Sequence, residues 1–152
     1  MSMTETLRLK GPWGLPEIEA FLRDTIIPLR LSTVSASGWP VVLSLWFLYE
    51  NGKLHCASRP QARIVELLRG EPRCGFEIAR DTPPYFGVRG QGHAALNQEN
   101  GERLLPRLIE RYLGEGDSKL RDQLLANAAD EVCIEIEPTR IMSWDFRERM
   151  RA

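Results

Sequence analysis

The sequence predicts one α+β domain in which an antiparallel, barrel-like sheet carries a few helices. Three observations lead to this prediction. Hairpin-linked strands alternate with helical segments, in the order helix, three strands, helix, two strands, two helices, two strands. Asn51-Gly52, a strong hairpin signal, separates two β-rich runs. Glycines interrupt a long strand near the middle of the chain, as they do at the corners of barrels.

The first third of the chain gives a helix followed by two strands. Residues 16–24 have the apolar spacing of an amphipathic helix, with Pro16 in its first turn. Residues 29–36 alternate as an extended strand, and residues 37–40 (SGWP) form a turn. Residues 41–49 (VVLSLWFLY) are apolar on nearly both faces, which predicts a central strand of the sheet.

The middle of the chain contains three strands and one helix. A short strand at 53–57 returns from the hairpin, and a helix follows over residues 58–70, with Pro60 in its first turn. Residues 73–79 form the next strand. Residues 85–96 (YFGVRGQGHAAL) form the long strand that glycines interrupt.

The last third closes the domain with two helices and two strands. Helical spacing predicts helices over residues 102–113 and 118–126. Clean alternation predicts a strand over 132–137, and a second strand follows over 141–146. The chain has no internal repeat, low-complexity tract or linker, so a single domain occupies residues 1–152.

Charge and hydropathy exclude several classes of protein. The 152 residues include 20 basic and 21 acidic side chains, so the net charge is −1. This balance excludes a nucleic-acid binder that depends on neutralising phosphates. The apolar share of 43% and the charged share of 27% exclude a disordered chain. The N-terminus lacks the apolar core of a signal peptide, and the longest apolar run is too short to span a bilayer. We therefore expect a cytoplasmic protein without membrane or nucleic-acid partners.

The potential metal ligands and nucleophiles form no known motif. Cys56, Cys74 and Cys133 are widely spaced and form no CxxC pair, and the two histidines are His55 and His93. Ligand counting therefore predicts reduced cysteines and no metal site. No nucleophile-elbow or zinc-protease motif is present, so the sequence assigns no catalytic residue.

One segment has the composition of a phosphate site. It lies where a strand is followed by a helix, so backbone N–H groups of Gln61, Ala62 and Arg63 are available at the helix start. The Ser58 hydroxyl and the guanidinium groups of Arg59 and Arg63 would complete an anion cradle. A helix cap beside ordinary surface arginines is the alternative interpretation of the same residues.

Several segments in a fixed order resemble the FMN-binding split barrel family, whose best-known member is pyridoxamine 5'-phosphate oxidase. The resemblance covers roughly 110 of the 152 residues and depends on the order and spacing of its segments rather than on any single motif. The matching segments are 31–42 (LSTVSASGWPVV), 44–47 (SLWF), 65–73 (VELLRGEPR), 87–96 (GVRGQGHAAL) and 134–146 (IEIEPTRIMSWDF).

The resemblance implies a six-stranded antiparallel split β-barrel with flanking helices, which forms a homodimer and holds its flavin at the interface. Residues carried over by position fall into three groups. Those along the flavin ring would be Leu43, Ser44, Leu45 and Trp46. Those around the phosphate would be Ala57, Ser58, Arg59, Gln61 and Arg63. Trp144, from the closing hairpin of the partner subunit, would cover the pocket. Core packing is the alternative role for Trp46 and Trp144.

Two departures from the family bear on substrate and cofactor. Pyridoxamine phosphate oxidases have an Arg-Lys pair where this chain has Arg59-Pro60, and they end in an Arg-Leu-His segment that is missing here. Oxidation of vitamin B6 is therefore not expected. Relatives that use a deazaflavin carry a Pro-Val-Trp-Phe run where this chain has residues 44–47, and a Lys where it has Arg63.

The resemblance thus implies an FMN-binding flavoprotein that acts as an oxidoreductase on an unknown small molecule. Because the cofactor carries the redox chemistry, the lack of a visible catalytic acid or base is no objection. Two alternatives remain open: a deazaflavin-dependent reductase, and a flavin- or haem-binding protein without turnover.

Overall fold

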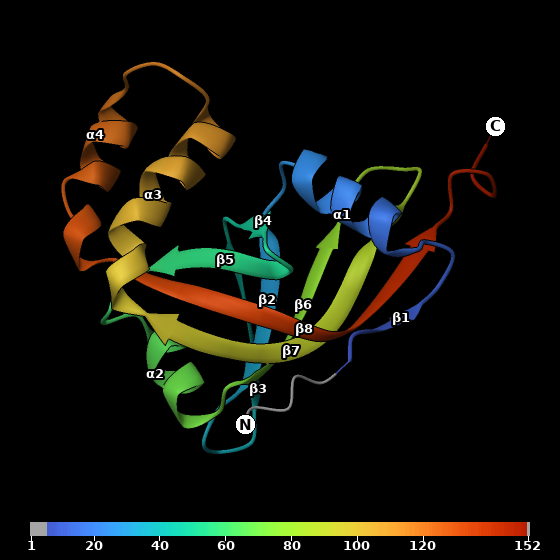
Figure 1. Ribbon diagram of the computed structural model, residues 1–152, viewed down its shortest axis with the longest axis horizontal. Coiled ribbons are helices and arrows are strands. Elements are labelled where there is room, and N and C mark those ends of the chain that lie inside the picture. The colour runs from blue at the N-terminus through green and yellow to red at the C-terminus, as the bar shows by residue number, and fades with distance from the viewer. Residues whose placement is uncertain (1–5, 152) are drawn as a thin grey trace.

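The computed structural model describes residues 6–151 and shows a curled antiparallel sheet with helices packed around it (Figure 1). None of the helices in this described part is long and apolar enough to cross a membrane. The strands are β1 (Arg8–Lys10), β2 (Leu29–Val34), β3 (Pro40–Leu45), β4 (Leu48–Glu50), β5 (Lys53–Ser58), β6 (Arg73–Ala79), β7 (Phe86–Asn97) and β8 (Val132–Asp145). The helices are α1 (Leu15–Asp24), α2 (Arg63–Gly70), α3 (Gln98–Leu113) and α4 (Lys119–Leu125), followed by a 3-10 turn at Ala128–Asp130.

The sheet curls because its two outermost strands are consecutive in the chain. The strand order is β3-β2-β6-β7-β8-β5-β4, and β1 pairs with β8 in parallel. β3 and β4 stand at opposite ends of this order, yet Trp46 and Phe47 alone separate them along the chain. That link spans roughly 10 Å, so the sheet must curve until its two edges approach each other. The product is a half-barrel with an inner and an outer face.

Alternate side chains of the strands fill the inside of the curl. Leu31, Phe76 and Ile78 are buried there, on the inner faces of β2 and β6. α1 covers one end of this interior with Ile18 and Leu22, which are fully buried (Figure 1). A second, smaller cluster packs α3 against β4 and β8, and its buried members are Leu48, Leu104, Leu108 and Cys133.

The predicted central strand over residues 41–49 is wrong. The structure divides this run into an edge strand, β3, and the short β4 at the opposite edge. The break falls at Trp46 and Phe47 because α3 holds both residues. The ring of Trp46 stacks on Tyr112, with centroids 5.0 Å apart, and the Phe47 N–H donates to the Tyr112 hydroxyl at 3.2 Å. A backbone donor engaged by a helix side chain cannot continue the ladder of β3.

The two strands predicted over residues 132–146 are a single strand, β8. β7 pairs with it from Cys133 to Asp145, so the same neighbour supports nearly its whole length. A bulge interrupts the pairing between Gln91 and Gly92. Pro138 lies opposite Gly92 at that point, where a missing backbone donor is tolerated. Glycines within a strand are typical of a bend, a bulge or a close backbone approach, and the structure shows a bulge beside Gly92.

Over residues 6–151 the sheet has eight strands, whereas the resemblance implies six. The sequence pattern misses β1 because it has three residues, all exposed, and therefore no alternation to detect. The pattern also places the start of α3 too late. That helix begins at Gln98, since the Asn97 side chain accepts hydrogen bonds from the N–H groups of Glu99 and Asn100 and caps it.

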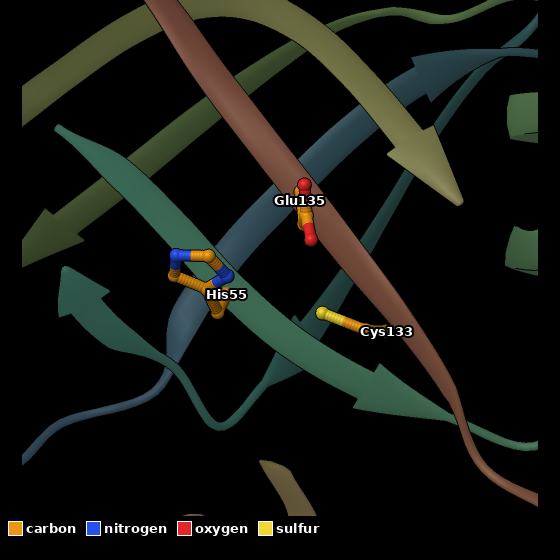
Figure 2. Close-up of side chains that lie close together, drawn as sticks. All are labelled: His55, Cys133 and Glu135. Atoms are coloured by element: carbon orange, nitrogen blue, oxygen red, sulfur yellow. The ribbon is translucent and has the colours of Figure 1, made fainter. Parts of the chain in front are cut away.

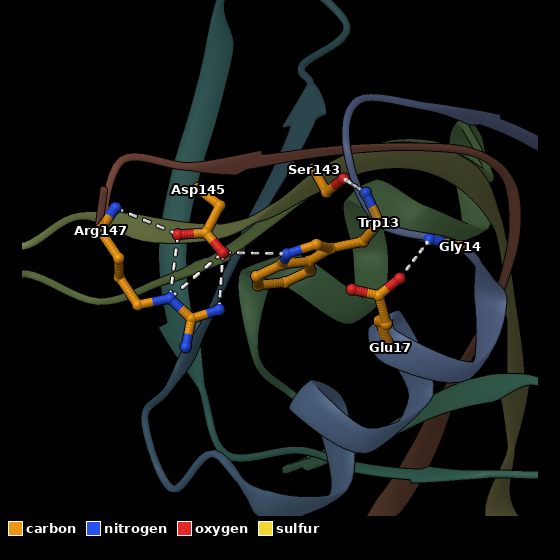
Figure 3. Close-up of polar contacts among 6 residues, drawn as sticks. All are labelled: Trp13, Gly14, Glu17, Ser143, Asp145 and Arg147. Atoms are coloured by element: carbon orange, nitrogen blue, oxygen red, sulfur yellow. Dashed lines mark hydrogen bonds and ion pairs between the residues drawn. The ribbon is translucent and has the colours of Figure 1, made fainter. Parts of the chain in front are cut away.

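The segment before α1 is fixed to the end of β8 by Trp13 (Figure 3). The backbone N–H of Trp13 donates to the Ser143 hydroxyl at 3.0 Å, and its indole N–H donates to Asp145 at 3.2 Å. Asp145 also accepts from the guanidinium of Arg147, with Nη2 at 2.6 Å from Oδ2. These hydrogen bonds lower the pKa of the Asp145 carboxyl from 3.8 to about 2, and the bond from Arg147 has the largest effect. Burial acts in the opposite direction.

Replacing Asp145 by asparagine should therefore cost stability in a pH-dependent way. A carboxylate whose pKa is lowered by folding stabilises the protein above its unfolded pKa of about 3.9. At pH 7 we expect the Asp145→Asn variant to be about 1 kcal/mol less stable, since Arg147 is half exposed and its charge is screened. The difference should shrink as the pH falls from about 4 towards 2. Urea unfolding at several pH values measures it, and a pH-independent difference would contradict this account.

Candidate functional site

Side chains that point away from the core line a depression on the outer face of the sheet. Its volume is about 540 Å³, and it extends over β3, β2, β6, β7 and β8. Gly75 lies in the floor of the depression, where a Cβ would reach ordinary van der Waals contact, 3.6 Å from the Gly90 carbonyl oxygen. We name this depression the outer hollow; its lining includes Arg30, Val42, Glu77, Arg89, Arg140 and Met142.

The outer hollow carries an excess of positive charge. Arg30, Arg89 and Arg140 line it, against the single carboxylate of Glu77. Within residues 6–151, none of these three arginines forms an ion pair. The guanidinium of Arg89 lies 5.5 Å from the centre of the Trp144 ring, which places this tryptophan at the border of the hollow. Such a surface favours an anionic group beside an aromatic ring.

The four residues predicted along the flavin ring lie on β3 and just after it. Leu43 and Leu45 turn inward and pack against the core, whereas Ser44 is exposed on the outer face opposite Arg30. Trp46 follows with its ring against α3. Among the strands of the described chain, β3 pairs with β2 alone, so one row of its backbone N–H and C=O groups has no partner strand there. Backbone contacts with a planar ligand are therefore possible along this edge.

The predicted start of the second helix at Ser58 is wrong, because α2 begins at Arg63. Ser58 is still paired with Val132 in the ladder between β5 and β8. The residues between form a turn, closed by a hydrogen bond of 3.1 Å from the Ala62 N–H to the Arg59 carbonyl. This bond takes up one of the three backbone donors that the sequence offered to a phosphate.

The predicted phosphate residues are brought together by this turn. Among the described residues, neither Arg59 nor Arg63 forms an ion pair. The charge of Arg59 does affect Glu131. Burial raises the pKa of the Glu131 carboxyl, and the positive charge of Arg59 offsets part of that rise. Arg63 lines a cavity of about 590 Å³ that the turn between β2 and β3 shares. The five predicted residues are Ala57 and Ser58, which are half-buried, and Arg59, Gln61 and Arg63, which are exposed.

Trp144 does not lie beside this turn. Val132, the partner of Ser58, is the first residue of β8, and Trp144 comes 12 residues later in the same strand, opposite Gly87. At about 3.3 Å per residue, the separation along the strand approaches 40 Å. Within one chain, therefore, Trp144 cannot cover a ligand whose phosphate lies at Ser58.

A separate group of potential metal ligands lies on the outer face of β5 and β8 (Figure 2). His55, Cys133 and Glu135 place one ligand atom each within 4.8 Å of one another. The sequence predicts no metal site because it offers no ligand spacing along the chain. The β5–β8 ladder nevertheless pairs His55 directly with Glu135, 80 residues away. Burial, and the nearby Glu135 carboxylate, raise the pKa of the Cys133 thiol to about 12.

Sequence reasoning missed the arginines of the outer hollow. Arg30, Arg89 and Arg140 come from β2, β7 and β8, and no motif connects them. The alternation of the predicted strands places Arg30 and Arg89 on outward positions, whereas Arg140 lies between the two strands predicted over 132–137 and 141–146. Alternation could not show that the three strands lie close together, because strand order is a property of the tertiary fold.

Comparisons with known proteins identify the fold. No protein-family model matches the sequence, and no curated protein does. Solved structures do match. A conserved hypothetical protein from Mycobacterium tuberculosis is 23% identical, with a TM-score of 0.77 over 93% of this chain and 90% of that one. A structure named F420 reductase is 23% identical, with a TM-score of 0.66 over 86% and 97%. A candidate pyridoxamine 5'-phosphate oxidase from Listeria innocua is 22% identical, with a TM-score of 0.65 over 84% and 95%.

The chain has the fold of the pyridoxamine 5'-phosphate oxidase-like proteins. The resemblance found in the sequence is thereby confirmed at the level of the fold. A FAD-binding protein from Mesorhizobium loti shares it at 17% identity, with a TM-score of 0.63 over 86% and 93%. A heme storage protein from Vibrio cholerae shares it at 21% identity, with a TM-score of 0.62 over 82% and 89%. The same pyridoxamine 5'-phosphate oxidase-like fold thus occurs in proteins named for a flavin, for F420 and for haem.

Proposed function

We propose that the protein is an FMN-binding oxidoreductase and that its curled sheet is the split barrel which the resemblance implies. The observation that carries the proposal is the turn from Ser58 to Arg63. It presents two arginines without ion pairs in the described chain, in a fold that FAD-binding and F420 proteins share. A phosphate is the ligand that such a cradle accepts best.

The residues present fit a bound FMN. Arg59 and Arg63 would hold the phosphate, and the unpaired backbone edge of β3 at residues 43–45 would lie along the ring. Arginine at the first position of α2 supports this role, because a positive charge there opposes the helix dipole and does not stabilise the helix. The bound flavin would supply hydride or electron transfer, and the chain would supply binding, orientation and a positive field.

We further propose a homodimer with the cofactor at the interface. The β2–β3 hairpin exposes three large apolar side chains: Val34 at 48%, Trp39 at 73% and Val42 at 66%. An apolar edge of this kind is unusual on a monomer and is typical of a surface that pairs with another chain. A second copy would also bring its Trp144 to a site that the same chain cannot reach.

A deazaflavin-dependent reductase is the second candidate. The observation in its favour is the likeness to the structure named F420 reductase, which covers 97% of that chain. A haem-binding protein without turnover is the third, through the likeness to the heme storage protein. The three candidates differ in their light-absorbing ligand, so one measurement separates them.

Absorption spectroscopy of the purified protein tests the proposal. Apoprotein is titrated separately with FMN, F420 and haem, and the stoichiometry and mass of each complex are measured. We expect one FMN per chain in a dimer. Saturable binding of F420 or haem without FMN would replace the proposal by the matching alternative. A monomer that retains FMN would contradict the interface site.

A further inference from the structure

The face of β5 and β8 that α3 covers brings three different ligand groups together (Figure 2). His55 lies directly opposite Glu135 in the antiparallel ladder, and Cys133 lies two residues before Glu135, on the same face of β8. An imidazole nitrogen, a sulfur and a carboxylate oxygen thus lie within 4.8 Å of one another. These three ligand types are the ones that zinc uses in proteins.

Hydrogen bonds orient two of the three ligands, His55 and Glu135. His55 Nε2 lies 3.1 Å from the Glu50 carbonyl, and Figure 2 shows the other ring nitrogen directed towards Cys133 and Glu135. A metal-bound histidine typically donates its second N–H to such a carbonyl, which leaves the first nitrogen free for the metal. On the other side, Asn100 of α3 donates from Nδ2 to Glu135 Oε1 at 3.4 Å.

An open space adjoins the three ligands. A cavity of about 490 Å³ is lined by all of them and by residues of α3. Three cationic side chains also line it: Lys53 of β5 and two arginines of α3. Arg107 is neutralised by Glu50, with Nη1 at 2.8 Å from Oε2, and Arg103 is exposed, so water screens its charge. Lys53 adds a further positive charge, so a cation enters this cavity when its bonds to the three ligands outweigh that repulsion.

We propose that His55, Cys133 and Glu135 bind one divalent transition-metal ion, zinc, with a fourth position open towards this cavity. Two ligands of a tetrahedral zinc ion lie about 3.5 Å apart, so ligand atoms that lie within 4.8 Å of one another must close by at most about 1.3 Å. Small side-chain rotations achieve this. The ion would link β5 to β8 beneath α3. Its ligand His55 lies two residues before Ala57, where the predicted phosphate residues begin. The proposal does not depend on flavin binding.

Metal titration of the full chain tests this site. Chelator-treated protein receives Zn²⁺ in competition with a chromophoric chelator, and a parallel sample receives Co²⁺. We expect one zinc per chain and a sulfur-to-cobalt charge-transfer band in the near ultraviolet. Cys133→Ser should abolish the band, and Cys133→Ser and Glu135→Gln should each weaken zinc binding at least about a hundredfold. Asn100→Ala should weaken it by roughly ten- to a hundredfold, as the loss of an orienting partner does.

His93→Gln is the matched control, since His93 is exposed on β7, opposite Arg73, and outside the ligand group. It should leave zinc affinity unchanged. If Cys133→Ser does not fold, as judged by circular dichroism, the half-buried Glu135→Gln carries the test. Zinc affinity that is equal in the wild type and Glu135→Gln, or cobalt binding without a sulfur band, would overturn the proposal.

Discussion

Replacement of Arg63 by alanine should weaken FMN binding by roughly ten- to a hundredfold and leave riboflavin binding unchanged. Arg63 is exposed, and within the described chain it forms no ion pair, so its charge is available to a ligand. A lost charge-assisted contact to phosphate costs about 1.5–3 kcal/mol. Riboflavin has no phosphate, so it cannot lose this contact. Fluorescence titration of apoprotein with both ligands measures the two affinities.

The same helix provides the control for this experiment. Arg69 is also exposed, but it lies in the last turn of α2. Arg69→Ala removes an equal charge and should leave both affinities unchanged. Removal of Arg63 should not unfold the protein, because arginine at the first helical position opposes the helix dipole. An equal loss of FMN and riboflavin affinity would place Arg63 away from the phosphate, and no loss would make it an ordinary surface arginine.

Local sequence patterns predict the elements that local forces determine. The strand over residues 73–79 and the Asn51-Gly52 hairpin are confirmed, because alternation and turn chemistry are properties of neighbouring residues. The single strand predicted over residues 41–49 is wrong because two of its apolar residues are held by a helix rather than by the sheet. Trp46 and Phe47 bind to Tyr112 on a helix that begins far later in the chain.

The candidate sites depend on pairings that no local pattern contains. The proposed phosphate residues could be suggested from the sequence because they are nearly contiguous, between Ala57 and Arg63. The potential zinc ligands could not, since the β5–β8 ladder alone brings His55 to Glu135. The outer hollow likewise requires three arginines from three strands. Spacing along a chain can predict ligands that lie on one element. Ligands on two paired strands can be identified when the pairing register of the strands is known.

The position of Trp144 leads to the second prediction with a large effect, the loss of FMN affinity when this tryptophan is replaced. It lies at one end of β8 and the turn from Ser58 to Arg63 lies at the other, so in the proposed arrangement one chain would hold two incomplete halves of a site. A homodimer completes both sites if each Trp144 covers the FMN of its partner. Trp144→Ala should then weaken FMN binding by about thirtyfold, or about 2 kcal/mol, which is typical of a tryptophan central to an interface. Its contact with Arg89 shows that the ring lies on the outer face, where a partner can reach it.

Mixing two defective variants distinguishes a site shared between subunits from one within a chain. Arg63→Ala and Trp144→Ala homodimers should each bind FMN weakly. After subunit exchange at equal concentrations, about half of the dimers are mixed, and one of the two sites in each mixed dimer combines a native Arg63 with a native Trp144. About a quarter of all sites should therefore recover tight FMN binding, measured by titration. Mixing Arg63→Ala with the double variant provides the control and should give no recovery, because every site then lacks Arg63. If mass spectrometry shows mixed dimers but tight binding does not return, Trp144 does not act across the interface.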